Sequence, residues 1–542
     1  MSNRISYENG SSSTPLIGET IGENLDRIAA THADREALVV CQQGLRWTYG
    51  QFAAHVDRLA RGLVAIGLRP GDRMGIWAPN CAEWVLVQYA SAKAGVILVN
   101  VNPAYRTSEL EYVLKQSGCR VLIAAQVFKT SDYVAMVAEV APRCAALERT
   151  LFLGSEEWAQ LLAAGEDEIA LPIGLQFDDP INIQYTSGTT GFPKGATLTH
   201  HNIINNGFFI GEACRYTSGD RVCIPVPFYH CFGMVLGNLA CTTHGACIVI
   251  PAPSFEPIAT LTAVQAERCT SLYGVPTMFI AELDLPEFDE FDLSSLRTGI
   301  MAGSPCPVEV MRKVIDRMHM SDVTICYGMT ETSPVSTQSG PDDDLEHRTS
   351  SVGRVHPHVE VKIVDPIEGQ CVPRGKPGEL CTRGYSVMLG YWNDSEQTAT
   401  AIDRAGWMHT GDLATMEEDG YVNIVGRSKD MIIRGGENVY PREIEEFLYT
   451  HADVRDVSVV GVPDERYGEE IAAFVVARAP GAVDLDSVRE FCDGRIAHYK
   501  IPRYVIAVDE FPMTVTGKIQ KFKLREQAIE ELRLQRAIVD TA

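Results

Sequence analysis

The sequence predicts an α/β protein: a large multi-layer α/β N-terminal domain with a small β-barrel-like subdomain, followed by a small α+β C-terminal domain. Three observations support this prediction. Short apolar runs alternate with helix-length amphipathic segments over roughly the first 340 residues. Short strands of alternating polarity begin near residue 350. After residue 430 the pattern changes again, to helices mixed with strands. At 542 residues, the chain is also too long for one ordinary domain.

The first part of the chain contains short, continuous apolar runs, which we interpret as largely buried strands. Such runs are typical of sheets covered by helices on both faces. They cover residues 73–79, 94–103, 119–125, 181–188, 221–227, 246–253, 270–276, 296–303 and 323–328.

The second and third parts differ from the first in their pattern. HVEVKIVD, GELCTRG and HTGDLATMEEDGYVNIVG predict a small β unit, a barrel or sandwich, with a hairpin turn at Asp419–Gly420. Beyond it, PREIEEFLYTH predicts a helix with proline at its first position. A strand, a second strand, a helix (LDSVREFC) and a last strand (YVIAVDE) should follow. We place the domain boundary at the charged step near Arg427–Lys429, giving domains 1–426 and 427–542.

Composition and charge exclude several classes of protein. The net charge of −24 argues against nucleic-acid binding, which needs a basic surface. The 15 cysteines form no C-x-x-C pair, so we expect reduced thiols. We see no apolar run long enough to span a membrane and no secretory or lipidation motif. These features predict a cytoplasmic protein; they leave open peripheral membrane contact and the choice between monomer and homodimer.

The stretch YTSGTTGFPKG, Tyr185–Gly195, is the candidate phosphate-binding loop. It lies between the predicted strand 181–185 and a helix expected near Thr199, a context in which backbone N–H groups surround an anion and Lys194 adds charge. It is not a Walker A loop, because Pro193 stands where glycine is required and Gly195 where Ser or Thr is required. The alternative is a flexible surface loop.

Three further loops follow other predicted strands. They are FYHCFG (228–233), AGSPCP (302–307) and YGMTE (327–331). Ligands in open α/β sheets bind beyond the carboxyl ends of strands. Together with the first loop they therefore predict one shared cleft.

YTSGTTGFPKG, AGSPCP, YGMTE, HTGDLA, GRSKDMI and PMTVTGK occur in the order and spacing of the adenylate-forming superfamily. The chain resembles that superfamily from about Asn24 to about Ala528, and within it most resembles medium- and long-chain fatty acyl-CoA ligases. This resemblance implies an acid–thiol ligase that uses ATP, Mg²⁺ and coenzyme A. A carboxylate attacks the α-phosphorus of ATP, pyrophosphate leaves, and a thiol then displaces AMP. It also implies that the C-terminal domain is mobile.

The resemblance assigns roles to residues that match these motifs. Lys518, Glu331, Thr330 and His230 would be catalytic, and Glu331 would hold Mg²⁺. Lys429 would be the hinge, and Gly435 and Gly436 would approach coenzyme A during thioester formation. The residues implied in ATP or AMP binding are Thr186, Ser187, Gly188, Thr189, Thr190, Gly191, Lys194, Gly303, Ser304, Pro305, Tyr327, Gly328, Asp412 and Arg427.

The acid substrate is predicted from the loops around the cleft. No acidic residue occurs between Pro225 and Leu239 to pair with the ammonium of an amino acid, and an unpaired buried charge is costly. Apolar and small residues predominate in these loops, as an alkyl pocket requires. The pocket residues we expect include Phe228, Gly233, Met234, Gly274, Ala302 and Met329. We favour a fatty acid, medium-chain before long-chain.

Several alternatives stay open at this point. An aryl acid could replace the fatty acid, and a carrier-protein thiol could replace coenzyme A. No carrier domain is appended, and the small β unit carries no large insertion, so coenzyme A is favoured. A non-catalytic nucleotide sensor is disfavoured because it has no need of Lys518. An oxygenating enzyme of the luciferase type has no sequence mark that we can identify.

Overall fold

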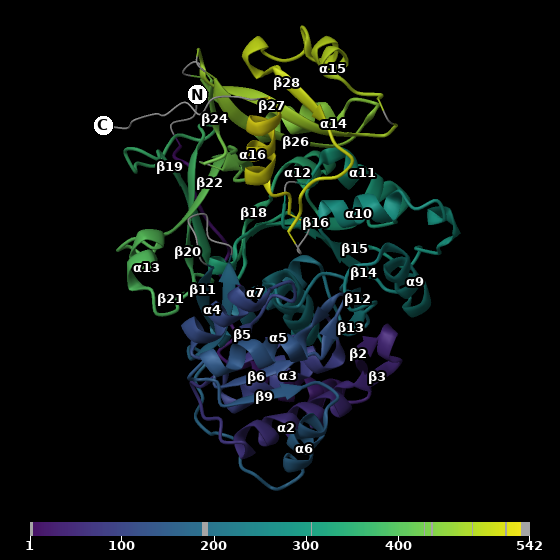
Figure 1. The fold of residues 1–542 in the computed structure, drawn as a ribbon, viewed down its shortest axis with the longest axis vertical. Helices are drawn as coiled ribbons and strands as arrows, with labels where there is room; N and C mark the ends of the chain where they lie inside the picture. The colour runs from purple at the N-terminus through teal and green to yellow at the C-terminus, as the bar shows by residue number, and fades with distance from the viewer. Residues whose placement is uncertain are drawn as a thin grey trace.

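The computed structural model describes residues 4–186, 193–304, 306–427, 429–434, 437–464, 466–479, 481–514 and 518–532. Figure 1 shows a large lower part built from the first two thirds of the chain and a smaller upper part that ends in the C-terminal helix. This arrangement confirms the predicted fold class, a large α/β part with a half-barrel sheet and a small C-terminal domain.

A seven-stranded sheet lies at one side of the N-terminal part. Its strands, in spatial order, are β21 (Gly390–Tyr391), β11 (Lys194–Thr199), β10 (Pro180–Thr186), β5 (Ile97–Asn100), β4 (Arg73–Trp77), β6 (Val121–Ala124) and β9 (Arg149–Phe152). The strands from β10 to β9 run parallel, whereas β11 and β21 pair antiparallel.

The second large sheet has nine strands. Their order is β18 (Arg354–Val355), β17 (Val335–Gln338), β16 (Asp322–Gly328), β15 (Thr298–Ala302), β14 (Ser271–Gly274), β12 (Arg221–Cys223), β13 (Cys247–Ile250), β2 (Glu36–Val40) and β3 (Leu45–Thr48). Each of the nine apolar runs predicted from the sequence contains a strand of one of the two large sheets.

Helices separate and cover the two sheets. They are α1 (Ile21–His32), α2 (Tyr49–Ala65), α3 (Ala82–Ala94), α4 (Thr107–Ser117), α5 (Tyr133–Val140), α6 (Glu156–Ala164), α7 (His200–Ala213), α8 (Ala240–His244), α9 (Pro257–Glu267), α10 (Pro276–Leu283), α11 (Val308–Arg317) and α12 (Leu345–Ser350). Helix α3 is buried on nearly every side, which is why its sequence is apolar all round. Its Gln88 donates to Met234 O in a π-helix, Phe232–Leu239, that follows His230.

The helix expected near Thr199 is confirmed, because α7 begins at His200 with Thr199 as its N-cap. A strand that was not anticipated precedes this helix: β11 (Lys194–Thr199) pairs antiparallel with β10. The loop therefore joins two strands of a hairpin. Residues 195–199 are buried between neighbours on both edges, β10 and β21, which favours the extended form. Thr199 caps α7 through a hydrogen bond from Asn202 N.

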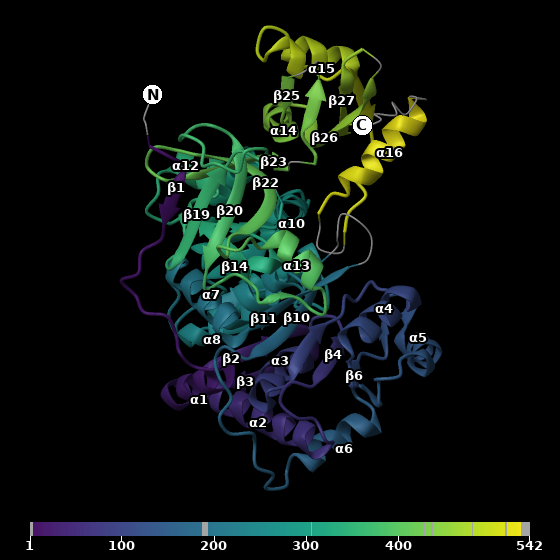
Figure 2. The same cartoon turned by 90° about the vertical axis from the view of Figure 1, so that its left-hand side faces the viewer.

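The predicted small β unit is a five-stranded antiparallel half-barrel. It contains β1 (Tyr7–Asn9), β19 (Val359–Val364), β20 (Gly378–Gly384), β22 (Met408–Met416) and β23 (Val422–Arg427), with α13 (Ser395–Ala401) between β21 and β22. The hairpin turn at Asp419–Gly420 is confirmed. Strand β1 beside β19, visible in Figure 2, was not anticipated.

The C-terminal part is the expected α+β unit. It holds β24 (Ile432–Arg434), β25 (Glu437–Val439), α14 (Pro441–Tyr449), β26 (Val454–Asp464), β27 (Gly468–Ala477), α15 (Leu485–Cys492), β28 (Tyr504–Ala507) and α16 (Lys521–Glu531). Lys518 lies just before the last helix: Thr514 N donates to Lys518 O at 2.8 Å, a bridge joins Met513 to Ile519, and α16 begins at Lys521.

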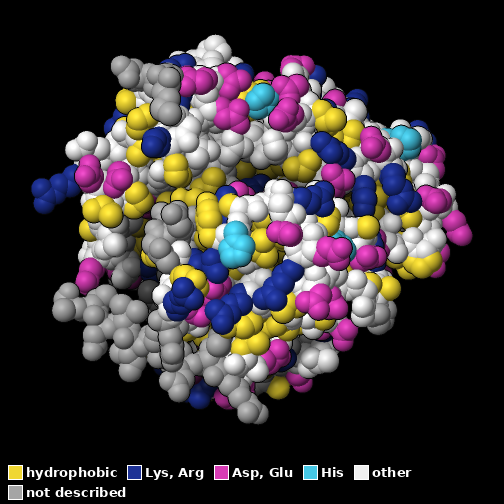
Figure 3. All heavy atoms as spheres, turned by 90° about the horizontal axis from the view of Figure 1, so that it is seen from above, with side chains coloured by type: hydrophobic (Ala, Val, Ile, Leu, Met, Phe, Trp, Pro, Cys, Tyr) yellow, Lys and Arg dark blue, Asp and Glu magenta, His cyan; other side chains and the backbone are white. Residues whose placement is uncertain are grey.

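Two surface properties bear on function. Within the described ranges, no helix combines the length and the apolar character needed to cross a bilayer. Although the chain carries a net charge of −24, Figure 3 shows Lys and Arg side chains gathered across the middle of the face seen from above. An acidic protein therefore presents a locally basic region.

Candidate active site

Loops from both large sheets and a segment of the C-terminal part meet at one place. Thr186 ends β10 in the first sheet, and its Oγ1 lies 3.4 Å from Oε1 of Glu331, which follows β16 in the second. A Cβ on Gly303, just after β15, would lie 3.9 Å from Cε of Lys518. Loops at the strand ends of the two sheets therefore contact one another, and the lysine of the C-terminal part lies beside one of these loops.

Some of the predicted site residues lie outside the described residues. They are Ser187, Gly188, Thr189, Thr190, Gly191, Pro305, Gly435 and Gly436.

Glu331 is held in a short 3₁₀ turn, Thr330–Thr332, directly after β16. Glu331 is only 5% exposed, so its carboxylate needs hydrogen-bond donors. The Tyr391 hydroxyl donates to Oε1 at 2.8 Å, and Thr186 Oγ1 reaches the same oxygen. Within the described part of the chain, Oε2 accepts no hydrogen bond. A single buried carboxylate with one free oxygen is a donor that suits Mg²⁺, which keeps most of its sites for water and phosphate.

Asp412, Tyr327 and Arg427 form a second polar group. Arg427 lies opposite Asp412 in the β22–β23 ladder, with Nε 3.0 Å from Oδ1. The Tyr327 hydroxyl, at the end of β16, donates to Oδ2 at 2.7 Å. Burial, and to a smaller extent the negative charge of Asp412, raises the pKa of Tyr327. The phenol therefore stays protonated and donates its hydrogen bond to Asp412. The arrangement provides a flat aromatic ring beside a carboxylate with fixed orientation.

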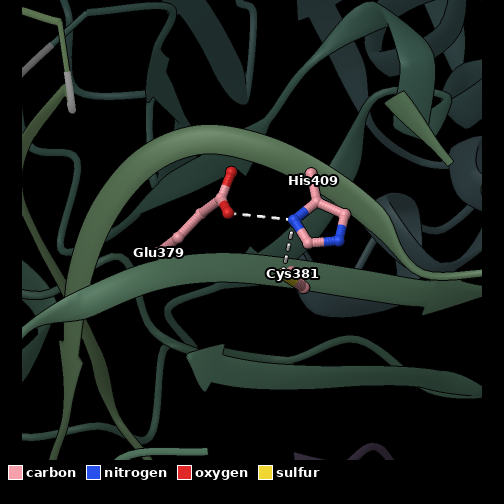
Figure 4. A group of neighbouring side chains, drawn as sticks. All are labelled: Glu379, Cys381 and His409. Atoms are coloured by element: carbon pink, nitrogen blue, oxygen red, sulfur yellow. Dashed lines mark hydrogen bonds and ion pairs between the residues drawn. The ribbon is translucent and has the colours of Figure 1, made fainter. Parts of the chain in front are cut away.

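The first residues of β22, before Asp412, are held by hydrogen bonds among Glu379, Cys381 and His409 (Figure 4). Nδ1 of His409 lies 2.9 Å from Oε2 of Glu379 and 3.5 Å from Sγ of Cys381. The other Glu379 oxygen accepts from Gly411 N at 3.1 Å. Although these residue types also bind metals, the hydrogen bonds alone explain why they lie together. Glu379 thus anchors both ends of the segment that precedes Asp412.

Lys518 and His230 lie on one pocket with mostly apolar walls. The pocket is lined by Val226, Pro227, His230, Phe232, Val275, Gly303 and Lys518. Burial, and to a smaller extent the positive charge of Lys518, lowers the pKa of His230 to about 3. The ring is therefore neutral at physiological pH. Burial, and next Arg427, lower the pKa of Lys518. The lysine of the C-terminal part therefore reaches into the N-terminal part beside the histidine.

Thr330 and Gly328 occupy the floor of the same region. Thr330 Oγ1 lies 3.7 Å from Sγ of Cys231, next to His230. A Cβ at position 328 would lie 1.7 Å from Pro334 O, so only glycine fits there. Ser304 follows Gly303, whose φ is +92°. The backbone at 303–304 is thus free to approach a flat ligand closely.

Lys194 begins β11 and points toward the half-barrel side. Its Nζ lies 2.6 Å from Oε1 of Gln397, on α13, and 5.2 Å from the ring centre of Tyr391. A polar cavity borders it, lined by Tyr112, Gln116, Pro193, Lys194, Gly195, Tyr391, Trp392, Asp394 and Gln397.

The predicted acyl-pocket residues occupy different environments. Phe228 is fully buried and packs against Trp84 with ring centres 5.5 Å apart. Met234 Sδ accepts from Asn100 and Gln184, each at 3.3 Å. A Cβ at Gly233 would lie 2.5 Å from Pro227 O, and one at Gly274 would lie 2.9 Å from the Phe279 ring.

The other two predicted pocket residues lie at strand ends. Ala302 ends β15, and Met329 follows β16 and is partly exposed. Two walls of the described pocket, Phe232 and Val275, are sequence neighbours of the predicted residues Gly233 and Gly274.

Lys429 lies just after β23, where the chain passes to the C-terminal part. The N–H groups of Asp430 and Met431 both donate to Arg427 O at 3.0 Å. Burial, and next Arg427, lower the pKa of Lys429. Lys429 therefore lies in a tight turn that directly follows the last strand of the half-barrel.

Sequence reasoning missed Tyr391 and Gln397, although both contact predicted site residues. Tyr391 lies 60 positions from Glu331 in the chain, and no motif links them. The only available indication is the Gly390-Tyr391-Trp392 run, an aromatic pair after glycine outside any amphipathic pattern.

The AMP-binding enzyme family profile matches residues 25–392, and the AMP-binding enzyme C-terminal domain profile matches residues 443–518. The chain is 50% identical to YngI of Bacillus subtilis (strain 168), over 96% of this chain and 99% of that protein. It is 44% identical to the mitochondrial medium-chain acyl-CoA ligase ACSF2 of Homo sapiens, over 98% and 91%.

Solved structures agree over nearly the whole chain. The anthranilate CoA ligase AuaEII in complex with anthranoyl-AMP superposes with a TM-score of 0.87 at 28% identity, covering 96% of this chain and 99% of that one. ATP-bound MatB from Rhodopseudomonas palustris gives a TM-score of 0.83 at 31% identity, covering 94% and 99%.

Proposed function

The chain belongs to the AMP-binding enzyme family, and from this premise we propose that it is a fatty acid–CoA ligase. It activates a fatty acid with ATP to an acyl-adenylate and then transfers the acyl group to coenzyme A, giving acyl-CoA, AMP and pyrophosphate. A medium-chain acid is favoured, in keeping with the 44% identity to ACSF2, named a medium-chain acyl-CoA ligase.

One observation carries the proposal. Lys518, from the C-terminal part, lines the same pocket as His230 and Gly303 and lies close enough to Asp412 and Glu331 to interact with their charges. A carboxylate and ATP repel one another, so their reaction needs a cation at the point of attack. A protein that only bound a nucleotide would have no need of this late lysine.

In the first half-reaction the residues compensate charge and align the reactants. Thr186, Lys194 and the loop Ser187, Gly188, Thr189, Thr190, Gly191 hold the β- and γ-phosphates. Thr330 binds the α-phosphate. Mg²⁺, when bound at Glu331, neutralises phosphate charge.

The nucleoside end of ATP is held by a separate set of groups. Adenine lies between Tyr327 and the backbone of Gly303, Ser304 and Pro305. Asp412 accepts from the ribose hydroxyls, with Arg427 beside it. Lys518 bridges the α-phosphate and the attacking carboxylate.

The second half-reaction uses a rotated C-terminal domain. We propose domains 1–426 and 427–542 with Lys429 as the hinge, because the tight turn after β23 is the described crossing point between the two parts. Rotation withdraws Lys518 and brings Gly435 and Gly436 beside the thioester-forming centre.

The acyl chain enters the region around His230, which closes the pocket. We propose that Phe228, Gly233, Met234, Gly274, Ala302 and Met329 contribute to the acyl pocket; in support, Gly233 and Gly274 adjoin Phe232 and Val275, which line the described pocket. Each buried methylene contributes about 0.8 kcal/mol to binding. An apolar pocket therefore favours an acid with an alkyl chain over an acid whose side chain carries a charge.

We also propose a cytoplasmic location, supported by the cysteines. Every cysteine of the chain is a free thiol, and most are buried, as suits a reducing compartment.

The test is an AMP-release assay over saturated acids of graded length, with anthranilate included and with coenzyme A either present or omitted. We expect a maximum at medium chain length and complete turnover only with coenzyme A. AMP release that stays at background with every acid would refute the ligase proposal. If the acyl group were transferred to a carrier-protein thiol but not to coenzyme A, the proposed acceptor would be wrong.

A further inference from the structure

Tyr391 contacts two groups to which the proposed function gives different tasks in binding ATP. Its hydroxyl donates to Oε1 of Glu331 at 2.8 Å, and its ring lies under the ammonium of Lys194, with Nζ 5.2 Å from the ring centre. One side chain therefore contacts both the carboxylate proposed for Mg²⁺ and the cation proposed for the terminal phosphates.

The backbone around Tyr391 is fixed by the strand that carries Lys194. Strand β21 pairs with β11, placing Tyr391 opposite Ala196. Trp392 N donates to Gly195 O at 2.7 Å, and Tyr391 N donates to Thr398 Oγ1 at 2.9 Å. Gly390 has a φ of +145°, and a Cβ there would lie 2.7 Å from Thr398 Cγ2. The ring is thus held on both sides by hydrogen-bonded backbone.

Lys194 is held without being neutralised. Its described partners are the amide oxygen of Gln397, 2.6 Å from Nζ, and the Tyr391 ring face. Gln397 is fixed in turn, since its N–H donates to Oδ1 of Asp394 at the start of α13. Neutral partners leave the full positive charge available for a phosphate.

The same reasoning applies to Glu331. A Lys or Arg partner would neutralise the carboxylate and compete with a metal ion for it. A phenol orients the carboxylate through a hydrogen bond but leaves its negative charge in place, as outer-shell partners of metal ligands do.

We propose that Tyr391 is a positioning residue that sets Glu331 and Lys194 in one arrangement for the Mg²⁺–triphosphate unit of ATP. The inference rests on the proposed function, and it assigns this role to a residue that contacts neither the acyl chain nor the adenine pocket.

The experiment separates the hydroxyl from the ring. Tyr391→Phe removes the hydrogen bond to Glu331 and keeps the ring under Lys194, whereas Tyr391→Leu removes both. Tyr7→Phe is the matched control: the hydroxyl of Tyr7, on the half-barrel's edge strand β1, donates to Glu360 on β19 at 2.7 Å, which gives a second tyrosine–glutamate pair.

Two binding readouts are used besides activity. Mn²⁺ affinity in the presence of ATP is measured by electron paramagnetic resonance, and ATP affinity without metal is measured by calorimetry. For Tyr391→Phe we expect Mn²⁺ to bind about tenfold more weakly, with metal-free ATP binding unchanged. For Tyr391→Leu we expect both affinities to fall. Tyr7→Phe should match wild type in both.

Mn²⁺ affinity of Tyr391→Phe within about twofold of wild type would overturn the inference. Equal loss of both affinities in Tyr391→Phe would overturn it as well, because the hydroxyl would then not act through the metal ligand. Failure of the proposed function is seen separately, as a wild-type protein that shows no acid-dependent pyrophosphate exchange.

Discussion

The hydroxyl of Tyr327 donates a 2.7 Å hydrogen bond to Oδ2 of Asp412. Arg427 binds the other oxygen, Oδ1, through Nε at 3.0 Å. The two partners come from β16 and β23, so strands of two different sheets fix one carboxylate. The orientation of Asp412 is therefore set by the fold before a nucleotide arrives, which limits the ordering cost of binding.

Asp412→Asn should weaken ATP binding. The amide keeps the shape and one acceptor oxygen but loses the charge that strengthens hydrogen bonds from ribose hydroxyls. We expect the ATP dissociation constant to rise about tenfold or more, measured by calorimetry with a non-hydrolysable analogue. Asp419→Asn, in the exposed hairpin turn of the same sheet, is the control. Unchanged ATP affinity in Asp412→Asn would contradict the ribose assignment.

Lys518→Ala should separate the two half-reactions. Adenylation loses the cation that lines the pocket beside His230, and acid-dependent pyrophosphate exchange should fall about 100-fold or more. Thioester formation from supplied acyl-AMP should persist, because it does not need that charge. Lys523→Ala, on the exposed face of α16, serves as control. If the two half-reactions fell equally, Lys518 would not be specific to adenylation.

Lys429→Pro should act in the opposite way. Proline fixes φ in the turn after β23 and hinders the rotation proposed for thioester formation. We expect transfer to coenzyme A to fall about tenfold or more while pyrophosphate exchange stays within about twofold, measured in parallel assays. Lys429→Ala is the control for loss of the charge alone. Equal losses in both assays would exclude the hinge.

Much of the fold could be predicted because buried strands leave a local mark in the sequence. Runs such as Arg73–Trp77 and Thr298–Ala302 are short, apolar and bounded by turn residues, and each forms a strand. The strand Lys194–Thr199 was not predicted, because the polar and small residues in ATLT give no apolar run, although pairing on both edges makes the segment a strand. Tertiary pairing overrode the local pattern there.

Site residues could be predicted only where they lie within a sequence motif. Thr330, Glu331 and Asp412 lie in motifs with fixed order; the first two share one short turn, and Asp412 is bonded to Tyr327 of the preceding strand. The Tyr391–Glu331 contact joins residues 60 positions apart, and the Lys194–Gln397 contact joins residues 203 positions apart. Such contacts depend on sheet order and helix placement, which local patterns do not determine.

Glu282 should make the protein less stable as the pH rises. It lies on α10, is 1% exposed, and within the described residues neither carboxylate oxygen has a hydrogen-bond partner. Burial raises the pKa of Glu282 well above its ordinary value, so the folded protein keeps it protonated. The unfolded chain ionises it once the pH passes the ordinary glutamate range, and stability then falls by about 1.4 kcal/mol per pH unit until the folded pKa is reached.

Glu282→Gln removes this ionisation while keeping the size of the side chain. Relative to wild type, the variant should gain free energy of unfolding steadily from mildly acidic to mildly alkaline pH, measured by urea denaturation at several pH values. Glu287→Gln, at an exposed position shortly after α10, should run parallel to wild type over the same range. Parallel curves for Glu282→Gln and wild type would show that the carboxyl group is already ionised in the folded protein, because only a proton taken up on folding produces the difference in slope.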